Sequence, residues 1–413
     1  MSGMRPRDAT ACPGLLRDGG SPRRGGEGRP MEVNSMHSVH SFRWISINAR
    51  GCVVALAVLL AVVAQAGLPV PAAAASKVLR VLTWSDYIDP EVVSAFESAF
   101  DVAVEFTFFE TDDRRAEILA ARDGRGFDVV LVAGHEAPKY LKQGWLAPLD
   151  DAKLPNRQHI DARWSGSVWG VEAHGVPYFW GTSGIAYRRD LVPAPITRWS
   201  QVLNPDEALH GRISMIRSAR ELTSVALRSL GYSLNTNDLG RLRQAERLLQ
   251  DQLPYVKSYS YVALTEESAL VSGEIWVAWI YSGDALMLQA FNEDIVYAVP
   301  EEGGNIWVDF WSVLAASDNP DLGHAFINFL NEPEVAARNA EFVYYATPNI
   351  AAELYLPDEY FENTTIYPPE SQLERSEFFL PLTPRAQKLT NGIMSRLLNA
   401  HIASRQSPTC CTN

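Results

Sequence analysis

The spacing of hydrophobic residues alternates along the chain between that of buried strands and that of helices. Short apolar runs at residues 78–82, 102–106 and 127–132 predict strands. Apolar residues recur at helical spacing in residues 92–100 and 115–122, which lie between those runs. Strands that alternate with helices pair in parallel through right-handed crossovers, so the pattern predicts an α/β fold.

A second block with the same alternation begins near residue 199. Further strands are predicted at residues 212–216, 275–280 and 305–314, and further helices at residues 137–143, 221–230, 239–252 and 321–340. Residues that favour helix ends accompany several of these elements. Asp89 with Pro90, and Asp238, are expected to begin helices, and Gly144 and Gly231 to end them.

The first 75 residues have a different pattern. The thirteen residues 52–64 are uninterruptedly apolar, Arg43 and Arg50 precede them, and small residues follow at 71–75. This layout is typical of a secretory signal peptide, with cleavage expected after Ala75. The alternative, a retained membrane anchor, fits less well because a span needs roughly 20 apolar residues. We therefore expect a protein secreted to the periplasm, with residues 1–75 cleaved or disordered.

Charge narrows the class of ligand. Residues 1–75 contain eight Arg, no Lys and four acidic residues, so removing this +4 segment from a chain of −13 leaves −17. Such a surface repels nucleic acid and anionic membranes and favours cationic ligands. The four cysteines all lie outside residues 53–409, so neither a disulfide nor a thiolate metal site is expected in the folded body. That body is long enough for two lobes.

Acidic and aromatic residues gather at the predicted strand ends. Ligands in open α/β sheets bind beyond the carboxyl ends of strands, and ammonium groups are attracted to carboxylates and aromatic faces. The groups of this kind are Trp84-Ser85-Asp86-Tyr87, Glu221, Tyr281 with Asp284, Trp307 with Asp309, and Tyr345. Taken singly, each group has a structural alternative, such as a core tryptophan or a helix N-terminal acid.

Motifs of catalysis are missing from the sequence. It contains no Gly-x-Ser-x-Gly, no glycine-rich phosphate loop and no His-Glu-x-x-His. We therefore expect no catalytic residue, metal or cofactor, and a protein that is not an enzyme. A hydrolase that uses two of the acids remains an alternative.

From about residue 78 to about residue 397 the chain resembles the periplasmic spermidine/putrescine-binding proteins of polyamine ABC transporters. The stretches that carry the resemblance are VLTWSDYIDP, FDVVLV, VPYFWGTSGIAY, ARELTSVALRSLGY, SGEIWVAWIYSGDA, PEEGGNIWVDFW, YYATPNIAA and IYPP. The resemblance implies a type II periplasmic binding protein fold. In that fold each of two lobes is a mostly parallel sheet flanked by helices, and the ligand lies in a cleft between the lobes.

The resemblance also implies boundaries and partners. We expect lobe 1 at residues 76–181 and 305–370, lobe 2 at residues 182–304 and 371–404, and a disordered tail at 405–413, with hinges near residues 178–187 and 299–305. The implied role is that of a monomer that captures a polyamine and delivers it to a membrane ABC permease. The alternatives are another cationic amine, such as agmatine or a basic amino acid, and a ligand-sensing role. A basic amino acid would need Arg188 or Arg220 to face the ligand.

Residue roles are implied position by position. The family's first ligand loop falls on Trp84, Ser85, Asp86 and Tyr87, and its amine-binding acids fall on Glu221 and Asp309. Its ligand-contacting rings fall on Tyr281, Trp307 and Tyr345, and an acid often present in the family falls on Asp284. Trp180 is a further candidate contact. The chain departs from the family at Tyr281, where tryptophan is commoner, and at residues 132–135, where His135 is a candidate contact in place of a missing hydroxyl.

Overall fold

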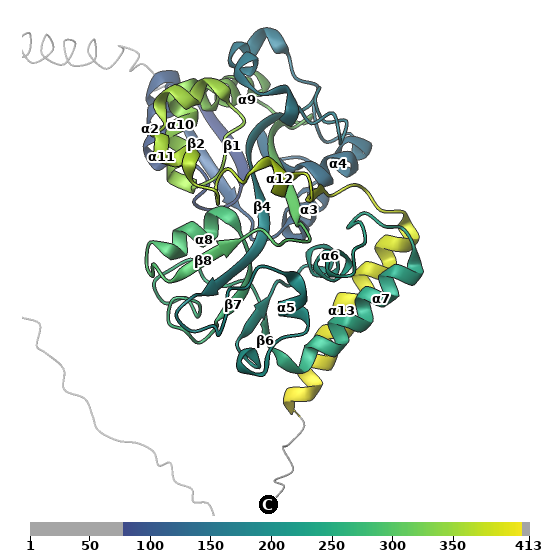
Figure 1. Cartoon of the computed structure of the whole chain (residues 1–413). Helices are drawn as coiled ribbons and strands as arrows, with labels where there is room; N and C mark the ends of the chain where they lie inside the picture. The colour runs from purple at the N-terminus through teal and green to yellow at the C-terminus, as the bar shows by residue number, and fades with distance from the viewer. Residues whose placement is uncertain (1–76, 407–413) are drawn as a thin grey trace, which may run out of the picture. The chain divides into compact units, whose positions relative to one another are not determined.

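The protein is described by a computed structural model that covers residues 77–406 (Figure 1). The expected leader, its cleavage site and residues 407–413 lie outside the described residues. The strands are β1 (Lys77–Thr83), β2 (Val102–Phe108), β3 (Val129–Ala133), β4 (Val176–Arg188), β5 (Ile213–Met215), β6 (Val256–Tyr259), β7 (Val277–Tyr281), β8 (Ile295–Ala298), β9 (Asn305–Val313) and β10 (Glu377–Phe378).

Helices connect these strands and cover the sheet, as Figure 1 shows. They are α2 (Pro90–Phe100), α3 (Asp112–Ala121), α4 (Ala137–Gln143), α5 (Trp199–Leu203), α6 (Ala219–Ser229), α7 (Leu239–Gln252), α8 (Ser282–Gln289), α9 (Pro320–Leu330), α10 (Pro333–Val343), α11 (Asp358–Glu362), α12 (Glu370–Leu373) and α13 (Pro384–Gln406). Within residues 77–406, no helix combines the length and the apolar character that crossing a bilayer requires.

The strands form one ten-stranded sheet with the order β2-β1-β3-β9-β4-β7-β5-β6, in which β10 pairs with β9 and β8 with β4. β1 is parallel to β2 and β3, and β5 is parallel to β6 and β7. The long strands β4 and β9 run antiparallel to each other in the middle, and β4 continues from β9 to β7. The predicted α/β class is therefore confirmed.

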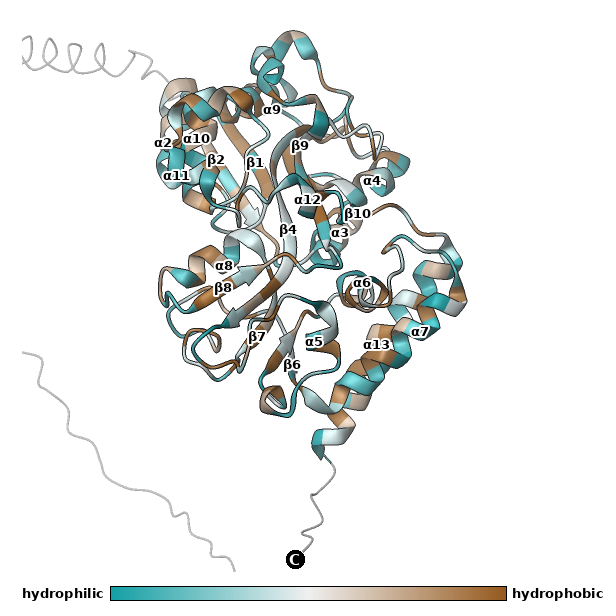
Figure 2. Ribbon diagram, in the orientation of Figure 1, coloured by the Kyte–Doolittle hydropathy of each residue, from teal (hydrophilic) through white to brown (hydrophobic). Residues whose placement is uncertain are grey.

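Two large hydrophobic cores lie on either side of this middle. One is built from residues 79–180 and 306–373, and the other from residues 185–279 and 386–397. Figure 2 shows hydrophobic stretches along β1 and β9, and hydrophilic residues interspersed with hydrophobic ones along α7. β4 runs through both halves of the sheet, because its first part pairs with β9 and its second part pairs with β7 and β8.

The predicted helix ends are confirmed. The Asp89 carboxylate accepts a hydrogen bond from the Glu91 backbone N–H at 2.8 Å, ahead of α2. Asp238 caps α7 in the same way through the Gly240 N–H at 2.7 Å. Gly144 adopts a left-handed conformation after α4, which costs glycine little.

Several sequence-based boundaries differ from the structure by a few residues, and two of the differences have an identifiable physical cause. Residues 321–340 were expected to form one helical stretch, but α9 ends at Leu330 and α10 starts at Pro333. Proline lacks an N–H and is tolerated only in the first turn of a helix, so it begins a second helix here. At the other end of the chain, α13 includes Arg405 and Gln406, which had been placed in the tail. The Arg405 guanidinium donates to the Lys257 carbonyl and holds this last turn.

A buried carboxylate anchors the strand that leads to the candidate site. Asp128, which is 2% exposed, precedes β3 and accepts hydrogen bonds from the Arg80 N–H at 2.9 Å and the Asn319 N–H at 3.1 Å. The Ser317 hydroxyl donates to the same side chain at 2.6 Å. Three segments therefore converge on one side chain.

We predict that Asp128→Ala lowers the free energy of unfolding by about 2–4 kcal/mol, because buried donors lose their acceptor. Urea denaturation followed by circular dichroism measures this loss. The matched control is Asp251→Ala at an exposed position of α7, for which we expect a change within about 0.5 kcal/mol. Equal effects of the two substitutions would contradict the anchoring role of Asp128.

Candidate ligand-binding site

Several elements present acidic or aromatic residues at the junction of the two halves. Trp84 directly follows β1, and Tyr281 is the last residue of β7. Glu221 lies in the first turn of α6, and Asp284 in the first turn of α8. Strand ends and helix starts meet at one edge of an α/β sheet, so side chains that are distant in sequence come together here.

One face of β9 contributes three of the polar and aromatic side chains. Asn305, Trp307 and Asp309 alternate along the strand and therefore point to the same side. Gly181 of β4 pairs with Trp307, and a Cβ at Gly181 would lie only 2.6 Å from the Trp307 ring. The Trp307 indole thus packs directly on the backbone of β4, and there is no room for a side chain at position 181.

Asp309 is buried among aromatic rings. Asp309 is only 6% exposed to solvent. The Tyr87 hydroxyl donates a hydrogen bond to its Oδ2 at 3.1 Å. Burial raises the pKa of Asp309 to about 7, although hydrogen bonds from Tyr87 and Trp84 favour the ionised form. A cation brought against this carboxylate would replace the hydration that it has lost.

Glu221 is the second buried carboxylate, and it comes from the other half of the sheet. It is 6% exposed, and Asn305 Nδ2 donates to its Oε1 at 3.1 Å. Its Oε2 is buried without a hydrogen-bond partner among the described residues. Burial raises the pKa of Glu221 to about 8. Through Asn305 this acid is tied to the strand that carries Asp309.

Tyr281 is influenced electrostatically by Asp309, by Glu221 and by two further acids. Its pKa is well above the ordinary value because of burial and then because of Glu221, Asp112, Asp309 and Asp284. Four carboxylates are therefore near enough to act electrostatically on one phenol. These four acids, together with Trp84, Tyr87, Tyr281, Trp307 and Tyr345, are called the acid–aromatic cluster below.

Asp284 orients one of the rings in the cluster. Its Oδ1 accepts a hydrogen bond from the Tyr345 hydroxyl at 2.6 Å, and its Oδ2 accepts one from the Tyr261 hydroxyl. Burial raises the pKa of Asp284, and the two phenols oppose that shift. The Tyr345 ring stands edge-on to Trp307, with 4.8 Å between the ring centroids. Asp284 therefore already has two donors and acts mainly on the arrangement of the rings.

Three expected contacts lie outside this cluster. Ser85 and Asp86 are exposed, and Asp86 has a left-handed backbone in the turn after β1. Trp180 pairs with Val308, so it points to the opposite side of the sheet from Trp307 and Asp309. There it stacks on Trp164 with 4.2 Å between the ring centroids. Trp180 thus packs in a core and does not face the acids.

His135 and Asp112 form one end of the site. His135 follows β3, and its Nε2 lies 3.7 Å from Asp112 Oδ2. Burial lowers the pKa of His135, although the Asp112 carboxylate opposes that shift. Phe379 stands beside the imidazole, with 5.6 Å between the ring centroids. The candidate position of His135 near the acids is therefore observed, and its neighbour Asp112 is an additional acid.

Sequence reasoning missed Asn305, Asp112 and Tyr261. Asn305 continues the alternation of Trp307 and Asp309 by one step, so the same pattern could have identified it. Asp112 follows the end of β2, as Asp284 follows the end of β7. Nothing in the sequence connects Tyr261 with Asp284, because only the fold places them together.

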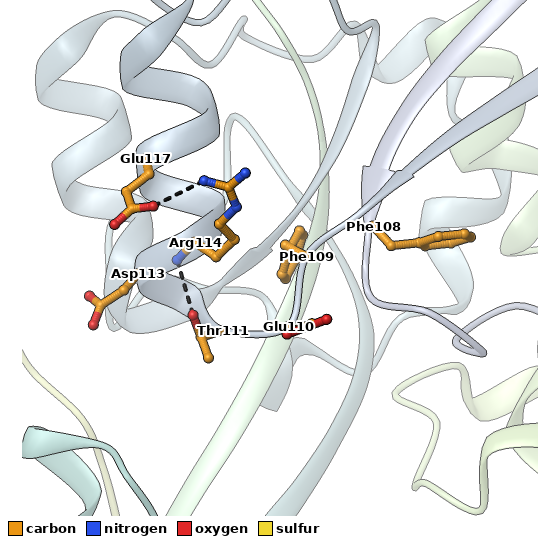
Figure 3. Close-up of a pocket in the computed structure, with 7 residues that line it drawn as sticks. All are labelled: Phe108, Phe109, Glu110, Thr111, Asp113, Arg114 and Glu117. Carbon is orange, nitrogen blue, oxygen red and sulfur yellow. Dashed lines mark hydrogen bonds and ion pairs between the residues drawn. The ribbon is translucent and has the colours of Figure 1, made fainter. Parts of the chain in front are cut away.

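A surface pocket adjoins the cluster but is distinct from it (Figure 3). This cavity of about 390 Å³ lies between the end of β2 and the start of α3. It is lined by Phe108, Phe109, Glu110, Thr111, Asp113, Arg114 and Glu117. Arg114 is paired with Glu117 at 3.1 Å, as Figure 3 shows. The Phe109 ring packs edge-on against Trp84, with 4.5 Å between centroids, and so separates the pocket from the cluster.

The chemistry of the cluster suits a cationic ligand. Buried carboxylates lose hydration, which a charge-assisted hydrogen bond from an ammonium restores. Aromatic faces attract the same cation by roughly 0.5–2 kcal/mol each and also cover methylene groups. Within residues 77–406 no group of three or more His, Cys, Asp and Glu has a metal-binding arrangement.

Comparison with known proteins gives consistent matches. The family model described as bacterial extracellular solute-binding protein matches residues 91–368. The chain is similar to the norspermidine sensor of Vibrio cholerae, with 35% identity over 319 residues that cover 77% of this chain and 88% of the relative. It is also similar to the putrescine/agmatine-binding protein of Pseudomonas aeruginosa, with 30% identity over 335 residues, 76% of this chain and 90% of that protein.

Solved structures agree with these sequence matches. The spermidine/putrescine ABC transporter substrate-binding protein of Streptococcus pneumoniae superimposes with a TM-score of 0.70 at 27% identity. The match covers 79% of this chain and all of that structure (100%). The arrangement of strands around the acid–aromatic cluster is therefore shared with a solved substrate-binding protein.

The raised pKa of Glu221 predicts how stability varies with pH. An acid whose pKa is higher in the folded state than in the unfolded state binds more protons when folded, so its contribution to stability is lost as pH rises. Between pH 4.5 and about 8, the ligand-free protein should become less stable. Glu221→Gln should flatten this slope by up to about 1.4 kcal/mol per pH unit.

Urea unfolding at several pH values within that window measures the slope. Glu266→Gln, at an exposed position, is the matched control and should leave the slope unchanged. A Glu221→Gln slope equal to that of the unmodified protein would show that this carboxyl is not buried in the way described.

Proposed function

Because the chain belongs to the family of bacterial extracellular solute-binding proteins, we propose that it captures a polyamine outside the cytoplasm and delivers it to an ABC permease. The chain has the two-lobed, type II periplasmic binding protein fold. This is a family of substrate-binding transport proteins and not of enzymes. The observation that carries the proposal is the pair of buried carboxylates, Asp309 and Glu221, that the two halves of the sheet contribute to one ring-lined cluster.

The two acids would divide the ligand between them. In the proposed complex Asp309 receives one ammonium group, with Trp84 and Trp307 beside it. Glu221 receives the other, through the Oε2 that has no partner among the described residues. Tyr281 and Tyr345 would cover the methylene groups in between. Each acid gains a counter-charge, which offsets the desolvation that raises the pKa of both groups.

Because the two acids come from different lobes, ligand binding would also bring the lobes together. We propose lobe 1 at residues 76–181 and 305–370, and lobe 2 at residues 182–304 and 371–404. A ligand held by Asp309 from one lobe and Glu221 from the other stabilises the closed state by bridging both. The flexing segments would be residues 178–187 and 299–305, where the chain crosses between the halves.

A basic amino acid is a weaker candidate ligand. Its carboxylate would need a cation, and the two arginines considered for that role are engaged elsewhere. Arg188 forms a two-point ion pair with Asp190 at 2.8 Å. Arg220 donates to Asn235 at 2.7 Å and lies over the Phe379 ring. An amine without a carboxylate fits these contacts better.

The remaining parts of the proposal concern the cellular setting. We propose that the leader directs the protein to the periplasm, where it acts as a monomer and docks on the permease when closed. One relative is a norspermidine sensor, so a pull-down of permease subunits, with or without polyamine, tests transport directly. Docking on a receptor in place of the permease would support the sensing alternative.

A thermal-shift panel tests the ligand class. Putrescine, cadaverine, agmatine, spermidine, norspermidine and spermine are each added to the purified protein, with lysine and γ-aminobutyrate as controls that carry a carboxylate. A tight ligand at about 100 times its Kd should stabilise the fold by about 2.7 kcal/mol through mass action. We expect at least one amine to do so and the controls to leave the melting temperature unchanged. If no amine raised it, the proposed function would be wrong.

Asp309→Asn tests the role of the first acid. The substitution keeps the shape of the side chain but leaves an ammonium buried without its counter-charge, so affinity should fall by about 3–5 kcal/mol. Isothermal calorimetry measures the loss, and exposed Asp251→Asn serves as the control. A loss smaller than about tenfold would remove Asp309 from the binding site.

A further inference from the structure

Arg115 is a cation buried beside a site that is otherwise acidic. It lies in α3 with no exposed side-chain surface. Its Nη2 contacts Asp112 Oδ1 at 2.6 Å, and its Nε donates to the Tyr140 hydroxyl at 3.3 Å. The guanidinium lies over the Phe109 ring, 4.9 Å from the centroid. These contacts hold a permanent positive charge in place.

The positive charge of Arg115 lies close to the acid–aromatic cluster, on the far side of the Phe109 ring. Phe109 separates the guanidinium from Trp84, against which it packs edge-on. Asp112, the ion-pair partner of Arg115, also faces His135, and His135 follows the end of β3 that pairs with Asp309. The same guanidinium lowers the pKa of Asp309, in opposition to burial. Arg115 therefore acts electrostatically on the site without belonging to its surface.

The net charge of the site follows from the carboxylates and guanidinium groups that act on one another there. The carboxylates are Asp112, Glu221, Asp284 and Asp309, and the guanidinium groups that act on them are Arg115 and Arg220. Glu136 is paired with Lys139 at 3.3 Å, and Glu377 with Arg228 at 2.6 Å, so each of these pairs is neutral. Burial lowers the pKa of His135, which favours its neutral form, so the imidazole is left out of the count. With the four acids ionised, two negative charges stay uncompensated.

We propose that Arg115 is a specificity-determining residue, which limits the site to two uncompensated negative charges and thereby selects dications over trications and tetracations. The inference rests on the proposed function and adds the ligand's charge to it. Diamines, and molecules with one ammonium and one guanidinium, match the site in charge. A third ammonium would be desolvated without a carboxylate of its own and would be repelled by Arg115.

The electrostatic argument predicts how charge changes alter selectivity. A change in the potential of the site acts on each ligand in proportion to its charge. Removing the positive charge of Arg115 should therefore help a triamine more than a diamine. Removing the negative charge of Asp112 should harm a triamine more than a diamine. The ratio of the two dissociation constants reports the charge, whereas a general loss of packing moves both constants together.

The experiment measures this ratio by calorimetry for putrescine and spermidine. The unmodified protein is expected to bind putrescine at least tenfold more tightly than spermidine. Arg115→Met keeps the length of the side chain without its charge and should shift the ratio at least tenfold towards spermidine. Arg115→Lys retains the charge and should keep the preference for putrescine. Circular dichroism and melting curves confirm that the variants are folded.

Two further variants keep the test decisive. Asp112→Asn, at a partly exposed side chain, should shift the ratio towards putrescine. The double variant Asp112→Asn with Arg115→Met restores the original net charge and should restore the original ratio. If Arg115→Met does not fold, the shift in Asp112→Asn together with retention in Arg115→Lys carries the test.

The outcomes separate the inference from the function on which it rests. If the unmodified protein binds no amine, the proposed function fails. If it binds amines but prefers spermidine, the inference is wrong and the function stands. If it prefers putrescine and the ratio is the same in all variants, selectivity comes from the shape of the site, and Arg115 has no part in it.

Discussion

Two carboxylates are buried where the halves of the sheet meet, and this burial constrains everything around them. Asp309 and Glu221 have lost most of their water, and each has only a partial substitute, Tyr87 for Asp309 and Asn305 for Glu221. Buried charge without a counter-charge is costly, so the groups hold their protons at higher pH than usual. The affinity proposed for an ammonium ligand has the same origin, because the ligand supplies the counter-charge that the buried carboxylates lack.

The pairing of the long strands β4 and β9 holds the side chains of this site in place. β9 pairs with the first part of β4, so the residues that β9 presents on one face are held at fixed spacing against β4, and the second part of β4 continues to β7. Gly181 and Gly283 let the rings of Trp307 and Tyr345 approach the backbone more closely than any side chain would allow. The rings therefore have defined positions beside the acids, and a flexible alkyl chain meets a preformed wall.

The surrounding charges tune a site whose basic chemistry is shared with its relatives. Arg115 and Asp112 form an ion pair at one end, and Arg220 lies beside Glu221 at the other. Because Arg115 is held away from water, its charge acts over a longer distance than a charge on the surface. In the proposed complex, the ligand's charge is thus selected by Arg115, a residue that does not touch it.

The sequence by itself determined the α/β class, the helix ends at Asp89, Gly144 and Asp238, and the acid-plus-aromatic chemistry. These features are local: strand and helix spacing, capping and alternation all act within a few residues. The break at Pro333 is equally local, because a proline at this position ends one helix and begins the next within a continuous helical pattern.

Only the tertiary structure decided which acids share a space. The side of the sheet that Trp180 faces depends on its pairing with Val308, more than 120 residues further along the chain. The links from Asn305 to Glu221 and from Tyr261 and Tyr345 to Asp284 likewise join separate elements. The burial that changes the pKa of Glu221 and Asp309 arises when segments far apart in the sequence pack around them. No window of sequence contains it, because desolvation is a property of the assembled fold.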